Sequence, residues 1–216
     1  MKNQINELSG KVARRIEEMT FFDVVSFIIS TIFSPLLIAC VFFLIVAIVN
    51  NDTIKTAWPQ LAIILFFIAI LPGTYILLLL EQKKIASIHL DSHADRKKPF
   101  IFAAASSLVG LIIICLIGAP KAFIAMDLAY TVNVLIIAII TQWWKISIHS
   151  AVISAIVILS IILFGNGYWV LIIIWILVAW ARVFRKRHTI AQVLAGALVA
   201  IVVTGTIFYF FGYKIF

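Results

Sequence analysis

The chain has 216 residues, of which 64% are hydrophobic and 12% are charged, and its mean hydropathy is +1.19. This composition excludes a soluble globular protein, because several apolar runs reach the ~18 residues that indicate a transmembrane helix. The formal net charge of +8 does not indicate nucleic-acid binding, because the charges fall in short loops between apolar runs. We therefore expect an all-α, polytopic membrane helix bundle whose partners are the lipid bilayer and anionic lipid.

Residues 1–20 precede the first apolar run and form a unit of their own. Apolar side chains recur there at three- and four-residue steps: Ile5, Leu8, Val12, Ile16 and Met19. Charged residues fill the remaining faces, so this spacing predicts an amphipathic helix that lies flat on the membrane surface. The remainder, 21–216, is expected to be a single membrane-embedded domain.

Apolar runs predict about six to seven transmembrane helices. Their approximate ranges are 22–49, 58–80, 99–117, 121–142, 149–164, 168–181 and 188–211. Pro35 lies inside the first run and predicts a kink or a local break. Turns are expected at 50–53 and 165–167. The sixth run is short, which implies a tilted helix or local thinning of the bilayer.

Asp127, Tyr130 and Asn133 share one face of the fourth predicted span. A carboxylate inside a membrane favours a functional role. Asp127, however, lies within two turns of the outer surface, where access to water explains it more simply.

Basic residues are distributed very unevenly between the two sides of the membrane. With seven spans, the loops after spans two, four and six share a side with the N-terminus. Of the 17 lysines and arginines, only Lys55, Lys121 and Lys214 fall on the opposite side. The positive side is expected to be cytoplasmic, in the cell membrane. All four histidines, His89, His93, His149 and His188, lie on that same side.

Three polar clusters, at 89–99, 145–150 and 181–196, belong to the three loops of the positive side. If the flanking spans pack together, the clusters converge on one pocket at the membrane surface. Histidine beside several arginines favours an anionic head group as the ligand. The simpler alternative is that the cations only fix the topology.

These clusters resemble the three motifs of the type 2 phosphatidic acid phosphatase superfamily. The third motif is Ser-Arg, five residues, His, three residues, Asp, and this chain has Ala181-Arg182, five residues, His188, three residues, Gln192. The second motif is Pro-Ser-Gly-His, and this chain has Ile146-Ser147-Ile148-His149. The first motif, Lys, six residues, Arg-Pro, is degenerate: either His89 precedes Arg96-Lys97, or Asp91 precedes Lys98-Pro99. We favour Arg96 as the family arginine.

The resemblance implies a metal-independent lipid phosphatase that works through a phosphohistidine and needs no cofactor. By that resemblance His188 is the nucleophile, and His149 is the general acid and then the base. The phosphate oxygens are expected to be held by a set of polar and basic side chains: Arg96, Lys97, Lys145, Ser147 and Arg182. The substrate is expected to be a phosphate monoester or diphosphate of an acyl or prenyl lipid, with the site on the cytoplasmic face.

Two of the departures from the family pattern change the chemistry expected of the site. Gln192 replaces the aspartate, so it can orient the imidazole of His188 but supplies no charge. Ala181 lacks the phosphate-binding hydroxyl of the family serine. We expect the cation of Lys145 to compensate in part for this lost contact. Three alternatives stay open: a lipid-phosphate binder or carrier without catalysis, a transferase with an acceptor other than water, and a divalent metal held by the loop cluster of His89, Asp91, His93 and Asp95.

Overall fold

The structure is a computed structural model that describes residues 20–49, 51–87, 90 and 93–214, with the backbone alone at 51–57 and 93–94. The predicted amphipathic helix at 2–19, and His89 and Asp91 of the first polar cluster, lie outside the described residues.

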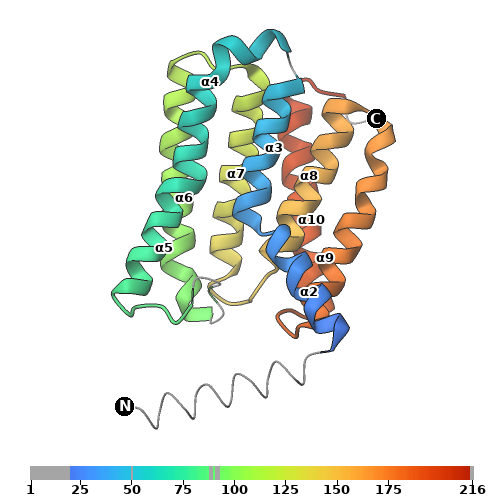
Figure 1. The fold of residues 1–216 in the computed structure, drawn as a ribbon. Coiled ribbons are helices and arrows are strands. Elements are labelled where there is room, and N and C mark those ends of the chain that lie inside the picture. The colour runs from blue at the N-terminus through green and yellow to red at the C-terminus, as the bar shows by residue number, and fades with distance from the viewer. Residues whose placement is uncertain (1–19, 50, 88–89, 91–92, 215–216) are drawn as a thin grey trace.

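The described part of the chain is all-helical, as predicted, and its long apolar helices are those of a polytopic membrane bundle (Figure 1). The helices in chain order are α2 (Phe21–Ile32), α3 (Pro35–Val49), α4 (Asn51–Leu65), the π-helical turn η1 (Phe66–Ile70), α5 (Leu71–Glu81), α6 (His93–Leu116), α7 (Lys121–Ile140), α8 (Ile148–Phe164), the 3₁₀ helix η2 (Asn166–Leu171), α9 (Ile172–Phe184) and α10 (Ile190–Phe210).

Within the described residues, five helical segments are long and apolar enough to cross a membrane: 58–81, 95–116, 121–140, 166–184 and 190–210. Helices α2 and α3 are together long and apolar enough to cross the membrane once, with a bend of 50° between them. Counted as one span, they give a sixth crossing. The break that Pro35 predicts is therefore confirmed, since Pro35 begins α3. The remaining predicted span, α8, has 17 residues and is shorter than the others.

Three predicted boundaries are wrong. The turn expected at 50–53 is not one, because α4 begins at Asn51. The sixth span is not short: η2 and α9 together give 19 residues, because the helix starts at Asn166 and continues to Phe184. The last span begins at Ile190 instead of His188, because the Thr189 side chain caps the helix.

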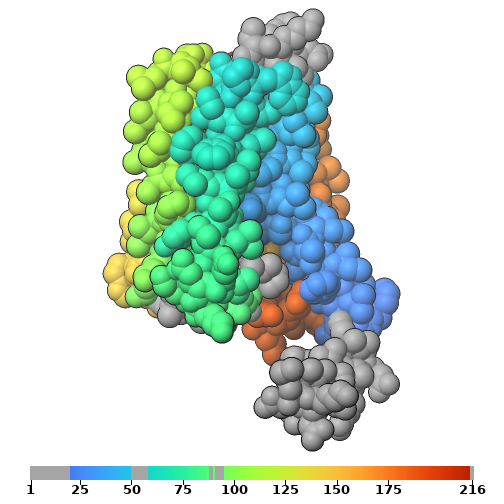
Figure 2. Space-filling model, turned by 60° about the vertical axis from the view of Figure 1, so that its left-hand side comes forward, coloured from blue at the N-terminus to red at the C-terminus, as the bar shows by residue number. Residues whose placement is uncertain are grey.

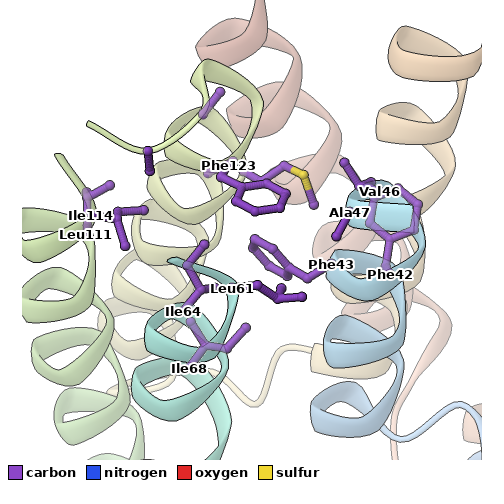
Figure 3. Close-up of a cluster of buried hydrophobic side chains, with 14 of the residues drawn as sticks. Phe42, Phe43, Val46, Ala47, Leu61, Ile64, Ile68, Leu111, Ile114 and Phe123 are labelled. Carbon is purple, nitrogen blue, oxygen red and sulfur yellow. The ribbon is translucent and has the colours of Figure 1, made fainter. Parts of the chain in front are cut away.

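Buried aromatic and aliphatic side chains hold the end of the bundle at which α3 meets α4, α6 and α7. Phe43 reaches from α3 into the space between Leu61 of α4 and Phe123 of α7 (Figure 3). All three side chains are at most 4% exposed. In a bilayer, tight packing of this kind holds helices together, because lipid tails are as apolar as the side chains.

The turn η1 explains two polar residues inside the membrane. A π-turn leaves carbonyl groups without their usual helical partner. The Ser106 hydroxyl donates to the Phe67 carbonyl, and the Tyr130 hydroxyl donates to the Ile68 carbonyl over 3.1 Å. The serine of α6 and the tyrosine of α7 therefore satisfy the backbone of a third helix.

The expectation that Asp127 reaches water is wrong. Its side chain is fully buried in α7, and neither carboxylate oxygen has a hydrogen-bond partner among the described residues.

The three connections that carry the polar clusters lie together at one end of the bundle, at the bottom of Figure 1. They join α5 to α6, α7 to α8, and α9 to α10. We call this the basic end. Helix α10 packs against both α7 and α8, and α2 packs against α9. The packing therefore brings the second and third polar clusters side by side.

Candidate active site

The N-terminus of α8 is locked to its neighbours by a buried serine. The Ser150 hydroxyl donates to the Val193 carbonyl of α10 over 2.7 Å and accepts from the Trp175 indole of α9 over 2.9 Å. One hydroxyl therefore bonds α8, which carries His149, to α9, which carries Arg182, and to α10, which follows His188.

A second contact between α8 and α10 depends on glycine. A Cβ at Gly196 would collide with the backbone carbonyl oxygen of Ser147. The backbone amide of Ser147 also donates to the Gln192 carbonyl over 3.1 Å. The small residue thus lets the start of α8 approach α10 closely.

His188 lies just before α10 with its ring held from two sides. Its Nδ1 is 3.2 Å from the Lys145 carbonyl oxygen and 3.1 Å from the Oε1 of Gln192. Both partners are acceptors, which assigns the proton to Nδ1 and leaves the lone pair on Nε2. The predicted pairing of Gln192 with His188 is therefore present. It arises from a capping box, in which the Gln192 side chain also accepts from the Thr189 amide, and not from a helical step.

His149 lies in the first turn of α8 and contacts the break of the first span. Its Nε2 is 3.3 Å from the Ser30 carbonyl oxygen, so this nitrogen is the donor and Nδ1 carries the lone pair of the neutral ring. The contact joins residues 119 positions apart, which no local pattern in the sequence indicates.

Arg96 is 3% exposed, which is rare for a guanidinium. Its Nε donates to the Leu90 carbonyl over 2.8 Å, and an Nη donates to the Ile146 carbonyl over 3.2 Å. These bonds fix the planar group between the first and second polar clusters.

One cavity of about 620 Å³ collects these groups. Both histidines, His149 and His188, line it together with Arg96 and Arg182. Two further arginines, Arg185 and Arg187, also line it and were not among the predicted phosphate-binding residues. The cluster of cations at 181–187 could have indicated that Arg185 and Arg187 belong to the site. The same cluster is also expected of a loop that only fixes the orientation of the protein in the membrane.

Three predicted phosphate-binding residues do not line this cavity. Lys97 is exposed on α6. Lys145 is half-buried; it offers its carbonyl to His188, and its charge acts on that ring. The Ser147 hydroxyl is fully buried as the N-cap of α8, where it accepts from the Ser150 amide. Its position suits the orientation of α8 better than direct contact with a phosphate.

The electrostatics of the site keep His188 neutral. Burial lowers the pKa of His188 to about 4, and the guanidinium groups of Arg182 and Arg96 act in the same direction. The hydrogen bond that His188 donates to Gln192 acts in the opposite direction, because it favours the protonated ring, but it is outweighed. At neutral pH the ring therefore has a free electron pair beside several cations, which is the state required of a nucleophile that attacks an anion.

The described residues contain no group of three or more histidine, cysteine, aspartate or glutamate side chains placed to hold a metal ion. The metal alternative rests on His89 and Asp91, which lie outside that part of the chain.

Fold and helix lengths define an integral membrane protein of the helix-bundle class. A scan against protein-family models, a search of curated proteins and a search of solved structures found no match to this chain.

Proposed function

We propose that this protein is a lipid phosphate phosphatase that hydrolyses the phosphate monoester or diphosphate of an acyl or prenyl lipid through a phosphohistidine. One observation carries the proposal: His149 and His188 line one cavity with Arg96 and Arg182, and the His188 ring has its lone pair on Nε2. The resemblance of the second and third motifs to the type 2 phosphatidic acid phosphatases supports the same roles.

In the first step, Nε2 of His188 attacks phosphorus, and the bond from phosphorus to the lipid oxygen breaks. The leaving alkoxide takes a proton from His149. Since Nε2–H of His149 donates to Ser30, Nδ1 of the neutral ring has to take up a proton from solution when the phosphate dianion binds beside it, and this proton is the one transferred. Arg96 and Arg182 balance the charge on the equatorial oxygens.

In the second step, His149 takes a proton from water, and the hydroxide attacks phosphorus. The bond from phosphorus to His188 breaks, and inorganic phosphate leaves. The basic end is the cytoplasmic end in this proposal, because the great majority of the lysines and arginines fall on that side.

A panel of lipid phosphates tests the proposal. Purified protein in detergent is expected to release inorganic phosphate from at least one lipid, in the presence of EDTA and without an added acceptor. His188→Ala is expected to abolish release, while Lys97→Ala, at an exposed position outside the cavity, leaves it unchanged. Equal rates for wild type and His188→Ala would remove His188 as the nucleophile.

A second candidate function is favoured by Gln192, which supplies no negative charge to stabilise a cationic His188. In that case the protein binds or carries a lipid phosphate without cleaving it. Binding of the panel lipids without phosphate release by the wild-type protein would select this function.

A further inference from the structure

The cavity extends far beyond the space that a phosphate needs. From the basic end, its lining continues along α8 past Ala155 to Leu159. Ten helical steps separate His149 from Leu159, which is roughly 15 Å at the rise of an α-helix. On α3 and α7 the lining reaches Phe43 and Met126.

The far end of this cavity is closed by the core cluster of Figure 3. Phe42, Phe43 and Ile68 belong to that cluster and also line the cavity. The cavity therefore has a basic end with two histidines and an apolar end in the bundle interior.

Polar side chains at intermediate depth are largely engaged with the bundle itself. The Tyr130 hydroxyl donates to the Ile68 carbonyl. The Asn133 amide nitrogen donates to the Ala129 carbonyl over 2.9 Å and to the Thr204 hydroxyl over 3.1 Å. Because these donors are used, the middle of the cavity offers an incoming molecule mainly apolar contact.

The lining of the cavity reaches the outer surface of the bundle between the first span and α5. It includes exposed side chains of the first span, Phe27, Thr31 and Leu36, and Leu77 of α5. The two sides lie close together, since a Cβ at Gly73 of α5 would be 3.7 Å from Leu36. Figure 2 shows this face, with α2 and α3 in blue beside α5 in green.

We propose that the cavity is a chamber for one hydrocarbon chain of a phosphate lipid, which lies inside the bundle with its phosphate at the basic end. The chain enters sideways from the bilayer between α5 and the break of the first span. Cations at one end, apolar walls at the other and an opening toward the lipid phase match this amphiphile along its whole length. The inference rests on the proposed ligand class but does not require cleavage.

The test is photolabelling of purified His188→Ala protein with hexadecyl phosphate that carries a diazirine at the end of its chain. Peptide mass spectrometry is expected to find the label on the residues of the closed end, Phe43, Met126 and Leu159. Unlabelled hexadecyl phosphate is expected to compete it away. Labels confined to the lipid-facing surface, such as Leu198, or labels that the competitor does not reduce, would overturn the proposal.

Two variants, each with one alanine replaced by phenylalanine, add a second readout. Ala155→Phe fills the chamber at half depth and is expected to lower labelling of the closed end by roughly tenfold, because a few methylene groups lose their buried site. Ala105→Phe, at an exposed position of α6 outside the cavity, is expected to leave labelling unchanged. Equal labelling in the two variants would also overturn the chamber. If Ala155→Phe does not fold, the positions labelled in the His188→Ala protein alone test the proposal.

Labelling and hydrolysis are independent outcomes. Labelling of the closed end in His188→Ala, together with no phosphate release by the wild-type protein, supports the chamber and overturns the phosphatase. Phosphate release with labels only on the outer surface supports the phosphatase and overturns the chamber.

Discussion

The Nδ1 of His188 lies 3.1 Å from the Oε1 of Gln192, so the imidazole is oriented by a neutral amide and not by a carboxylate. This pairing fixes the tautomer that a nucleophile needs. It does not stabilise the cationic ring of a phosphohistidine, because an amide oxygen carries only a partial charge.

Replacement of Gln192 by aspartate is expected to raise the pKa of His188. In the wild-type protein that pKa is lowered to about 4, so the ring stays unprotonated down to about that pH. A carboxylate favours the protonated ring, and the acid limb of kcat/KM is expected to move up by roughly 1–3 pH units in Gln192→Asp. The turnover number at neutral pH is expected to rise, because the new charge stabilises the intermediate.

The pH profiles of wild type and Gln192→Asp on one lipid phosphate provide the measurement. Thr189→Ala, which removes the cap of α10 but keeps Gln192, is the control. An acid limb that stays in place in Gln192→Asp means that His188 is not the group that titrates.

The assignment of His149 as general acid predicts a dependence on the leaving group. An alkyl phosphate has a poor leaving group and needs a proton, whereas p-nitrophenyl phosphate has a good one. His149→Ala is expected to slow cleavage of the alkyl ester by about 10²–10⁴-fold. The effect on phosphoenzyme formation from p-nitrophenyl phosphate is expected to be much smaller. Rapid-quench measurement of the first turnover separates the two steps, and equal losses for both substrates would assign His149 another role.

Arg96 and Lys97 are adjacent cations with very different environments. Arg96 is buried in the cavity wall, and Lys97 is exposed outside it. Arg96→Lys keeps the charge but loses the geometry that bonds the Leu90 and Ile146 carbonyls, so we expect a loss of about 10²–10³ in kcat/KM. Lys97→Met is expected to leave kcat/KM within about twofold of wild type, as for a surface charge. Steady-state kinetics on folded protein compares the two; a larger loss in Lys97→Met would restore that residue to the site.

Gly196 and Gly205 of α10 form a pair that tests the close approach to α8. Gly196→Ala places a methyl group against the Ser147 carbonyl, and we expect it to destabilise the protein by about 1–3 kcal/mol. A Cβ at Gly205 meets nothing within 4 Å, so Gly205→Ala is expected to be neutral or to stabilise by up to about 1 kcal/mol. Thermal unfolding in detergent measures both. A stable Gly196→Ala protein with unchanged kinetics would show that the helices do not need this contact.

Sequence patterns alone were sufficient for the class of fold. Hydropathy along the chain predicts the spans, because the bilayer forces each backbone group to be bonded within its own helix. Proline chemistry predicts the break at Pro35, and short-range spacing brings Gln192 to His188. These features depend on neighbours in the chain, which the sequence displays directly.

The tertiary structure alone decides which cations face the cavity and where the cavity leads. Arg96 and Lys97 are adjacent in the chain, and Ser147 and His149 are two residues apart, yet only Arg96 and His149 line the cavity. The bond of His149 to Ser30 and the bond of Ser106 to Phe67 join helices far apart in the chain. Such contacts depend on how rotated and bent helices pack, and hydropathy carries no information about that rotation, because most faces of these helices are apolar.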